Sequence, residues 1–343
     1  MKAIICQETN KMAYQNIEMP QIDHSKDEVI LRIIAVGVCG SDIHTHKGGN
    51  PLFEYPKVLG HEIAAVVHAV SDAQKSDLVI GDLVTIMPYK YCGVCQACRM
   101  GKENCCASLE VLGVHINGGM TEYLKIESTY VIKIDSKMKA EQIAMIEPLS
   151  ISEHAVARGN IVEQDILLVI GAGMIGIGAA LMARLRTQKV IIMDTNEERL
   201  NFCREVLGFS NTINALEDAE KKLLEITGGL YATAVIDATG SESSMNAAVN
   251  YLCNGGRLVF VGIHKTNICI NDMSFHKRET SLYASRAAFR CDFEYVIENI
   301  ENGKIDPSLL ISHESTFDGF IEAFETWLLP ESKLIKGLLK VGN

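Results

Sequence analysis

The stretch Ile166–Gly176, ILLVIGAGMIG, decides the fold. Its first five residues form the apolar run of a buried strand, which leads directly into a G-x-G-x-x-G motif and then a helical pattern over residues 173–186. A motif of this kind, placed between a strand and a helix, is typical of a dinucleotide-binding loop. Gly171 permits the tight turn, Gly173 lets the backbone approach a pyrophosphate, and Gly176 allows close packing of helix on strand. The alternative is that the glycines serve packing alone.

The residues that follow predict which dinucleotide is bound. The N-terminus of the helix, at Met174 and Ile175, offers backbone N–H groups to a phosphate. The next expected strand, Val190–Met193, is followed by Asp194, whose carboxylate can accept hydrogen bonds from both adenosine ribose hydroxyls and repel a 2′-phosphate. This favours NAD over NADP; the alternative is that Asp194 caps a helix. Arg199, one helical turn further on, is a candidate to stack on the adenine.

The two parts of the chain differ in their hydrophobic patterns, which together indicate the α/β class. From Ile166 onward, expected strands (166–170, 190–193, 234–236, 257–261) alternate with expected helices (173–186, 197–207), which predicts a doubly wound parallel sheet. Up to about residue 150, short Val- and Ile-rich strands (1–14, 28–36, 63–70, 78–86, 123–126) predict a β-rich, barrel-like or partly open antiparallel domain. The last section, with a helix over 292–301 and a strand over 335–341, either caps the sheet or returns to the first domain.

Length and composition limit the possible classes of protein. A chain of 343 residues, 48% of them hydrophobic, predicts two folded domains. The formal net charge of −11 argues against a partner that is nucleic acid or anionic membrane, and favours a small-molecule partner. Ile166–Ala183 carries no charge, but its four glycines argue against a membrane helix. No signal peptide is expected, and 11 cysteines, an odd number, disfavour a disulfide framework, so we expect a cytoplasmic protein.

Four cysteines lie within fifteen residues in the pattern C-x2-C-x2-C-x7-C, and they predict a zinc site. They are Cys92, Cys95, Cys98 and Cys106. Four thiolates with no exchangeable ligand are typical of a structural Zn²⁺ site, which performs no chemistry. Cys105 is adjacent to Cys106, so spacing alone leaves either as the fourth ligand. An iron–sulfur cluster is disfavoured because Ala107, and not a proline, follows the last cysteine; a redox disulfide would not need four cysteines.

A second group of possible ligands is spread more widely along the chain. Cys39 and His61 suit Zn²⁺, and Glu62 or Glu147 could complete an open site. On spacing alone, each of these residues is as readily explained by packing or by solvent exposure.

Three features together resemble the zinc-dependent medium-chain alcohol and polyol dehydrogenases. They are the G-x-C-G-S-D-x-H motif of residues 37–44, the G-H-E motif of residues 60–62, and the four-cysteine segment ahead of the dinucleotide unit. Gly81–Asp82, expected within a strand, also fits, and the resemblance spans essentially the whole chain. It implies a catalytic zinc on Cys39, His61 and a carboxylate, and a structural zinc whose fourth ligand is Cys106.

The same resemblance implies the domain organisation. A GroES-like catalytic domain would cover residues 1–150, with the zinc lobe at about 88–108; a Rossmann NAD-binding domain would cover 151–285; and residues 286–343 would return to the first domain. Glu147 stands where simple alcohol dehydrogenases carry a third sulfur or nitrogen ligand, as in the polyol and threonine dehydrogenase branch. Either Glu62 or Glu147 can then ligate the metal, directly or through water.

Four further stretches resemble bacterial sugar-acid 5-dehydrogenases. They are residues 46–50, 55–61, 111–119 and 275–280. The resemblance implies oxidation of the C5 hydroxyl of L-gulonate to give D-fructuronate, or of L-galactonate to give D-tagaturonate. An acid substrate needs a basic partner, for which Lys90 and Arg286 are candidates and Arg290 a weaker one. The alternatives are a dehydrogenase of neutral polyols such as sorbitol or galactitol, and a non-catalytic NAD- or zinc-binding protein, which the full set of ligand residues disfavours.

The family pattern also implies roles in the reaction. Zinc would lower the pKa of the substrate hydroxyl, and Ser41 would pass its proton through the nicotinamide ribose hydroxyls to His44. Glu147 would belong to the same catalytic group, and Asp42 would hydrogen-bond the second nitrogen of His61. Relatives are commonly dimers or tetramers joined through the NAD domain, so a homodimer or homotetramer is expected.

Overall fold

The computed structural model describes residues 1–49, 53–135 and 137–342, and the chain divides into two compact units. Unit 1 consists of Met1–Glu147 and Phe293–Asn343, and unit 2 consists of Pro148–Asp292. These divisions fall a few residues from the expected boundaries at 150 and 286. Asn50, the last residue of one of the stretches compared above, lies outside the described residues.

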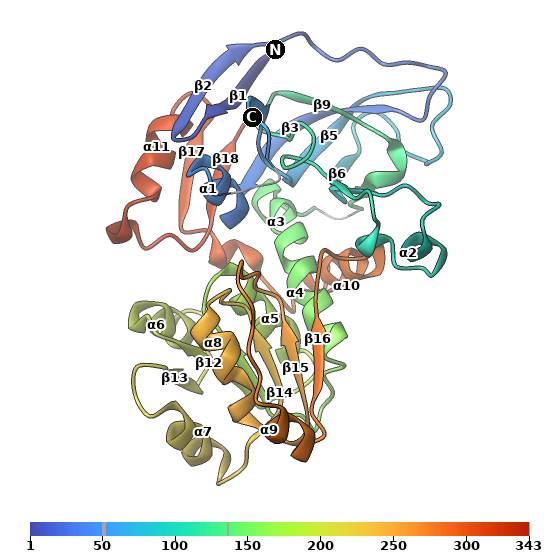
Figure 1. Ribbon diagram of the computed structural model, residues 1–343. Helices are drawn as coiled ribbons and strands as arrows, with labels where there is room; N and C mark the ends of the chain where they lie inside the picture. The colour runs from blue at the N-terminus through green and yellow to red at the C-terminus, as the bar shows by residue number, and fades with distance from the viewer. Residues whose placement is uncertain (50–52, 136, 343) are drawn as a thin grey trace. The chain divides into compact units, whose positions relative to one another are not determined.

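Unit 1 is built on a seven-stranded sheet in the order β10-β6-β5-β3-β18-β17, with β9 also paired to β3 (Figure 1). Its strands are β3 (Val29–Val38), β5 (Glu62–Val70), β6 (Leu83–Ile86), β9 (Tyr123–Ile126), β10 (Val131–Lys133), β17 (His313–Thr316) and β18 (Gly337–Lys340). β18, from the end of the chain, pairs antiparallel with β3, so the last residues complete the first unit. The strand of the C-terminal section therefore belongs to the first unit.

Smaller elements surround this sheet. Two further sheets are formed by β1 (Lys2–Glu8), β2 (Lys11–Asn16) and β4 (Lys57–Val58), and by β7 (Tyr89–Lys90) and β8 (Glu110–Val111). The α-helices are α1 (Gly40–His46), α2 (Gln96–Arg99), α3 (Ala140–Ala144) and α11 (Phe320–Trp327), while α4 (Ile146–Arg158) and α10 (Arg290–Glu301) cross the unit boundaries. The 3₁₀ turns are η1 (Glu103–Cys105), η2 (Ser128–Tyr130), η4 (Pro307–Leu310) and η5 (Pro330–Ser332).

The core of unit 1 joins residues from both ends of the chain. Leu31 and Ile63 of the central strands pack in one cluster with Phe320, Phe324 and Leu339. All five side chains are almost completely buried. Because burial of each large apolar side chain stabilises the fold by about 1.5–3 kcal/mol, the C-terminal section is an integral part of this core.

Unit 2 is a six-stranded parallel sheet in the order β13-β12-β11-β14-β15-β16. The strands are β11 (Leu167–Ile170), β12 (Val190–Asp194), β13 (Thr212–Asn214), β14 (Ala232–Asp237), β15 (Leu252–Phe260) and β16 (Ser281–Ala284). The helices are α5 (Met174–Arg184), α6 (Glu197–Glu205), α7 (Ala219–Thr227), α8 (Glu242–Ala247), η3 (Ala248–Tyr251) and α9 (Asp272–Lys277). The chain reverses direction across the sheet between β11 and β14, where dinucleotides bind in doubly wound folds. The predicted α/β architecture is therefore confirmed.

Two local predictions were wrong. Residues 1–14 do not form one strand: β1 and β2 make a hairpin, with Asn10 at a positive φ of 58° in the turn. Residues 78–82 are not part of the strand expected over 78–86. Gly81 has a φ of 96°, and Asp82 accepts a hydrogen bond from the Val79 N–H, so Gly81–Asp82 form a turn that precedes β6. Across the described ranges, no helix combines the length and apolar character that crossing a membrane requires.

Candidate functional site

Cys39, His61 and Glu62 form a compact group in unit 1. Cys39 lies between β3 and α1, and His61 and Glu62 stand at the start of β5. One ligand atom from each residue lies within 4.8 Å of the others. Gly37, paired with Glu62 across the two strands, leaves room for the carboxylate, since a Cβ at Gly37 would lie 2.0 Å from its Oε2 atom. The sequence-predicted ligands Cys39, His61 and Glu62 are thus brought together by neighbouring strands.

Glu147 contributes a second buried carboxylate to unit 1. It stands in the first turn of α4, and the hydroxyl of Tyr89, on β7, donates a hydrogen bond to its Oε1 atom. Both side chains are buried. Tyr89 was not foreseen from the sequence. Tyr89 ends a run of buried residues that begins at Val84, so it carried no signal beyond packing.

Lys336 is the second residue that sequence reasoning missed. Its Nζ atom lies 2.7 Å and 2.8 Å from the two carboxylate oxygens of Glu62, and 3.1 Å from the carbonyl oxygen of Val38, to which it donates. The lysine is only 2% exposed. Its position immediately before β18 brings it to this site because β18 pairs with β3.

Acidic side chains lie close together around His61, and they shift the pKa values in this part of unit 1. Burial raises the pKa of Glu147, and the nearby Glu62 adds to that rise. Burial alone would lower the pKa of His61, but the Cys39 thiol and the neighbouring carboxylates raise it well above its usual value. A thiol, two carboxylates and an imidazole gathered in a buried place are the donor set that suits Zn²⁺. The donors therefore fit a zinc ion.

Asp42 does not make the hydrogen bond to His61 that the family resemblance implied. Its carboxylate accepts hydrogen bonds from the backbone N–H groups of Cys39 (2.9 Å) and Gly60 (3.4 Å). The Nδ1 atom of His61 is buried and has no hydrogen-bond partner within the described part of the chain. The predicted bond from His61 to Asp42 was therefore wrong. Asp42, fully buried in the first turn of α1, instead holds the backbone on which Cys39 and His61 stand.

Ser41 and His44 lie one turn apart on α1. The hydroxyl of Ser41 is buried and makes no hydrogen bond to the described residues, whereas His44 is exposed. A Cβ at Gly49 would lie 2.3 Å from the His44 ring, so the glycine leaves room for the imidazole. The pair thus combines a buried hydroxyl with an exposed imidazole ring.

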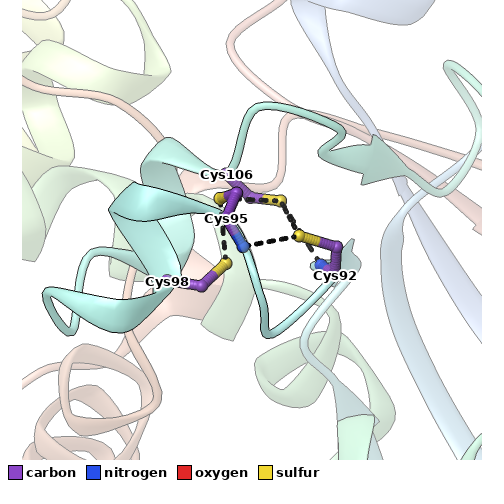
Figure 2. Close-up of side chains that lie close together, drawn as sticks. All are labelled: Cys92, Cys95, Cys98 and Cys106. Atoms are coloured by element: carbon purple, nitrogen blue, oxygen red, sulfur yellow. Dashed lines mark hydrogen bonds between the residues drawn. The ribbon is translucent and has the colours of Figure 1, made fainter.

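The four cysteines of the lobe converge as Figure 2 shows. The sulfur–sulfur distances are 3.5 Å for Cys95–Cys98, 4.0 Å for Cys95–Cys106 and 3.5 Å for Cys92–Cys106. Zn–S bonds of about 2.3 Å in a tetrahedron would hold sulfurs about 3.8 Å apart. The four sulfurs therefore fit one Zn²⁺ ion. Cys105 is exposed and is not a member of the group.

Backbone N–H groups favour the thiolate form of Cys92, one of the four cysteines of this lobe. The N–H groups of Val94 and Cys95 lower the pKa of the Cys92 thiol to about 6. Because the thiolate is the form that binds zinc, Cys92 is ready to ligate at neutral pH.

The glycine-rich loop of unit 2 lies at a cavity of about 460 Å³ at the carboxyl ends of the strands. Gly171 has a φ of 101°, and a Cβ at Gly176 would lie 1.7 Å from the carbonyl oxygen of Gly171. These two glycines are required by the turn and by packing. A Cβ at Gly173, which lines the cavity, would meet no atom within 4 Å. Gly173 therefore faces open space, and Met174 and Ile175 follow at the start of α5, which fits a bound pyrophosphate.

Asp194 and Arg199 line the same cavity. The Asp194 carboxylate accepts hydrogen bonds from the backbone N–H groups of Ala172 (2.5 Å) and Asn196 (2.8 Å). The helix cap is Asn196, whose side chain accepts from the N–H groups of Glu198 and Arg199, so Asp194 is not the N-cap. Its orientation is fixed by the glycine-rich loop itself.

Another part of this cavity is lined by hydroxyl side chains that were not predicted from the sequence. Asp237, at the end of β14, accepts hydrogen bonds from the hydroxyls of Thr239 (2.6 Å) and Ser244 (2.5 Å), and both of these residues line the cavity. The available signal was an acidic residue at the carboxyl end of a parallel strand next to β11.

The basic side chains predicted to bind the substrate carboxylate are Lys90, Arg286 and Arg290. Lys90 pairs with Glu127 at 2.8 Å, and it follows Tyr89 on a strand, where successive side chains point to opposite faces. Lys90 therefore does not join Tyr89 at the buried group. Arg286 and the weaker candidate Arg290 are exposed residues of unit 2.

Comparison with known proteins identifies the family of the chain. Residues 25–136 match the alcohol dehydrogenase GroES-like domain, and residues 174–302 match the zinc-binding dehydrogenase domain. The chain is 36% identical over 339 residues to the L-galactonate-5-dehydrogenase of Escherichia coli K12, covering 99% of this chain and 98% of that protein. It is 28% identical to the sorbitol dehydrogenase of Bacillus subtilis 168, covering 98% and 96%.

A solved structure is also similar over the full length. It is an alcohol dehydrogenase from Escherichia coli CFT073 in complex with NADH, 30% identical, with a TM-score of 0.92 and 99% of both chains covered. On this full-length similarity, the two matched domains and the two groups of zinc-type donors, the chain belongs to the zinc-dependent medium-chain alcohol dehydrogenase family.

Proposed function

We propose that this protein oxidises the C5 hydroxyl of a sugar acid to a ketone, converting L-gulonate to D-fructuronate or L-galactonate to D-tagaturonate. At the coarser level it is an oxidoreductase of the polyol and sugar-acid class that uses zinc and NAD. The observation that carries the finer proposal is the identity of 36% to an L-galactonate-5-dehydrogenase along nearly the whole chain.

The reaction follows from what the buried group in unit 1 can hold. Cys39, His61 and one of the carboxylates Glu62 and Glu147 would hold the zinc ion. When bound, zinc supplies the positive charge that makes the substrate hydroxyl acidic, and NAD accepts the hydride. Tyr89 holds the Glu147 carboxylate in place, and Asp42 fixes the backbone at Cys39. The four-cysteine lobe would hold a second, structural zinc.

The chain also provides a path for the proton. The Ser41 hydroxyl is buried without a partner among the described side chains, so it is available to take a proton from the substrate hydroxyl. His44, exposed one turn later on α1, can release it to solvent. A Ser41→Ala variant that kept full turnover would contradict this assignment.

A sugar acid brings a carboxylate that needs a counter-charge. Lys90 and Arg286 remain the proposed partners. Lys90 would have to leave Glu127 in order to bind the substrate, and Arg286 is an exposed residue in unit 2. Both are therefore to be replaced, each in a separate variant.

The substrate proposal is tested with a panel of aldonates and polyols in the presence of NAD. L-galactonate and L-gulonate are expected to give kcat/KM values at least about tenfold above those of sorbitol and galactitol, since a buried or paired charge contributes more than about 1.4 kcal/mol. The reduction of NAD is followed by the absorbance of its nicotinamide ring, and the product ketone is identified by mass spectrometry. Greater activity on the neutral polyols would favour the alternative, a polyol dehydrogenase, which the similarity to sorbitol dehydrogenase supports.

The preference for NAD is assigned to Asp194. An Asp194→Asn variant should lower kcat/KM for NAD by about tenfold to a hundredfold, because charge-assisted hydrogen bonds contribute about 1.5–3 kcal/mol. The ratio of NADP to NAD activity should rise, since the charge that repels a 2′-phosphate is removed. Glu205→Gln, an exposed change at the far end of α6, serves as the control. Unchanged discrimination in Asp194→Asn would contradict the assignment.

We further propose that the protein forms a homodimer or homotetramer through unit 2. β16 is the last strand in the order of its sheet, and Leu282 on it is 43% exposed. A sheet edge of this kind is commonly covered by another chain. Light scattering measures the assembly.

A cytoplasmic location is proposed because all eleven cysteines are free thiols, which suits a reducing compartment.

A further inference from the structure

Lys336 is an unusual residue in unit 1, because lysine is almost never fully buried unless its charge is paired. Its ammonium group has three N–H donors, and three acceptors surround it: both carboxylate oxygens of Glu62 and the carbonyl oxygen of Val38. Lys336 thus neutralises Glu62 from a fixed position. The sheet itself fixes it there, since β18 pairs with the end of β3.

The two carboxylates of this group have partners of different charge. Glu62 is paired with an ammonium, whereas the partner of Glu147 is the neutral hydroxyl of Tyr89. A carboxylate that shares its charge with a lysine is a weaker metal ligand than one held by a phenol. Glu147 is therefore the stronger of the two ligands for a divalent cation.

The number of available ligands makes this difference important. Cys39, His61, Glu62 and Glu147 together would close a tetrahedral site, and four protein ligands are typical of a structural zinc. A catalytic zinc instead keeps one position for water or substrate. Glu62 lies near enough to Cys39 and His61 to complete the set, so something must weaken it as a ligand.

We propose that Lys336 is a positioning residue that holds Glu62 back from the metal and so keeps one coordination position open for the substrate. This inference rests on the proposed function. With Lys336 in place, the thiolate and two carboxylates balance the charges of one Zn²⁺ ion and one ammonium group. Without it, Glu62 becomes a fourth ligand, and the site changes from a catalytic to a structural type.

The test replaces Lys336 with methionine, which keeps the length of the side chain and removes its charge. Lys336→Met should release the catalytic zinc to a chelator about tenfold more slowly, and should lower kcat by about tenfold or more, the usual range for residues that orient metal ligands. Replacement of the catalytic zinc by Co²⁺ gives a second readout. The visible spectrum should shift as Glu62 joins the metal, a change that a merely structural role would not produce.

Three further variants accompany Lys336→Met. Lys340→Met removes a partly exposed lysine of β18 that pairs with Glu314 and Glu141, and it should change neither zinc release nor kcat. In the double variant Glu62→Gln/Lys336→Met, zinc release should return to within about threefold of that of Glu62→Gln alone, because no carboxylate is left to be freed. Lys336→Arg, which keeps the charge, should restore part of the activity.

The outcomes separate the inference from the function on which it rests. Faster loss or unchanged release of the catalytic zinc in Lys336→Met would overturn the inference. If Lys336→Met does not fold, the Glu62→Gln variant provides the test. Glu62→Gln should still hold two zinc ions per chain. Loss of one ion would show that Glu62 is itself a needed ligand and would overturn the inference. A wild-type chain that carries zinc only in the cysteine lobe would instead overturn the proposed function.

Discussion

Replacing Cys39 with alanine is expected to lower kcat/KM by at least about a thousandfold, the largest effect of any single change in unit 1. Positive charge at the substrate oxygen contributes several kcal/mol to the transition state, and each 1.36 kcal/mol corresponds to about a factor of ten in rate. Cys39 supplies the only thiol of the Cys39–His61–Glu62 group, so its loss removes the strongest of the candidate ligands.

Zinc counting and kinetics together test this result. Native mass spectrometry should find two zinc ions in the wild-type chain and one in Cys39→Ala, with the lobe still occupied. Cys253→Ala, a partly buried cysteine of β15 in unit 2, is the matched control and should keep both ions and full activity. Retention of both zinc and activity in Cys39→Ala would rule out Cys39 as a ligand.

Replacing Cys106 with alanine is expected to unfold the lobe and to leave the chemistry of the Cys39 group in place. Cys106 is 3% exposed, and its sulfur lies within 4.0 Å of the sulfurs of both Cys92 and Cys95. A structural zinc contributes folding free energy directly, on the order of 10 kcal/mol in small zinc domains. Loss of one lobe ligand should therefore release that zinc and leave residues 92–106 without their main constraint.

The neighbouring residue provides a matched control. Cys105→Ala changes an exposed cysteine outside the group of four, and it should leave the zinc content and the melting temperature unchanged. Cys106→Ala should lower the melting temperature by roughly 5 °C or more, and proteolysis within the lobe should be at least about tenfold faster. The reverse result, with Cys105→Ala losing the zinc, would make Cys105 the fourth ligand.

The sequence was informative where one physical requirement determines the residues. The run from Ile166 to Ile170 had to be a buried strand, since parallel sheets are covered on both faces and leave no polar alternation. Gly171 and Gly176 had to be glycines because a positive φ and a contact with a carbonyl oxygen exclude a side chain. Cys92, Cys95 and Cys98 were predictable because their ligand spacing is local, whereas the choice of Cys106 over Cys105 came from the family resemblance.

What sequence could not provide was the set of partners that meet only through the sheet. Tyr89 and Lys336 are separated from the carboxylates they contact by 58 and 274 positions, and each has an ordinary local sequence. The role of Asp42 was predicted wrongly for a related reason. Both a histidine nitrogen and a backbone N–H were plausible donors, and only the entry of the chain into α1 selects the backbone. Likewise, the turn at Asn10 was hidden in a run that reads as one strand.

The pairing of β18 with β3 has a consequence for synthesis in the cell. Ala35–Val38, the residues that lead to Cys39, hydrogen-bond on one side to Gly337–Lys340, which are translated about 300 positions later. At about 5–20 residues per second, roughly 15–60 s separate the translation of these partners. During that interval the nascent chain carries an unpaired apolar strand edge, which is a template for aggregation. Lys336 is also absent during that interval, so Glu62 has not yet met its buried partner.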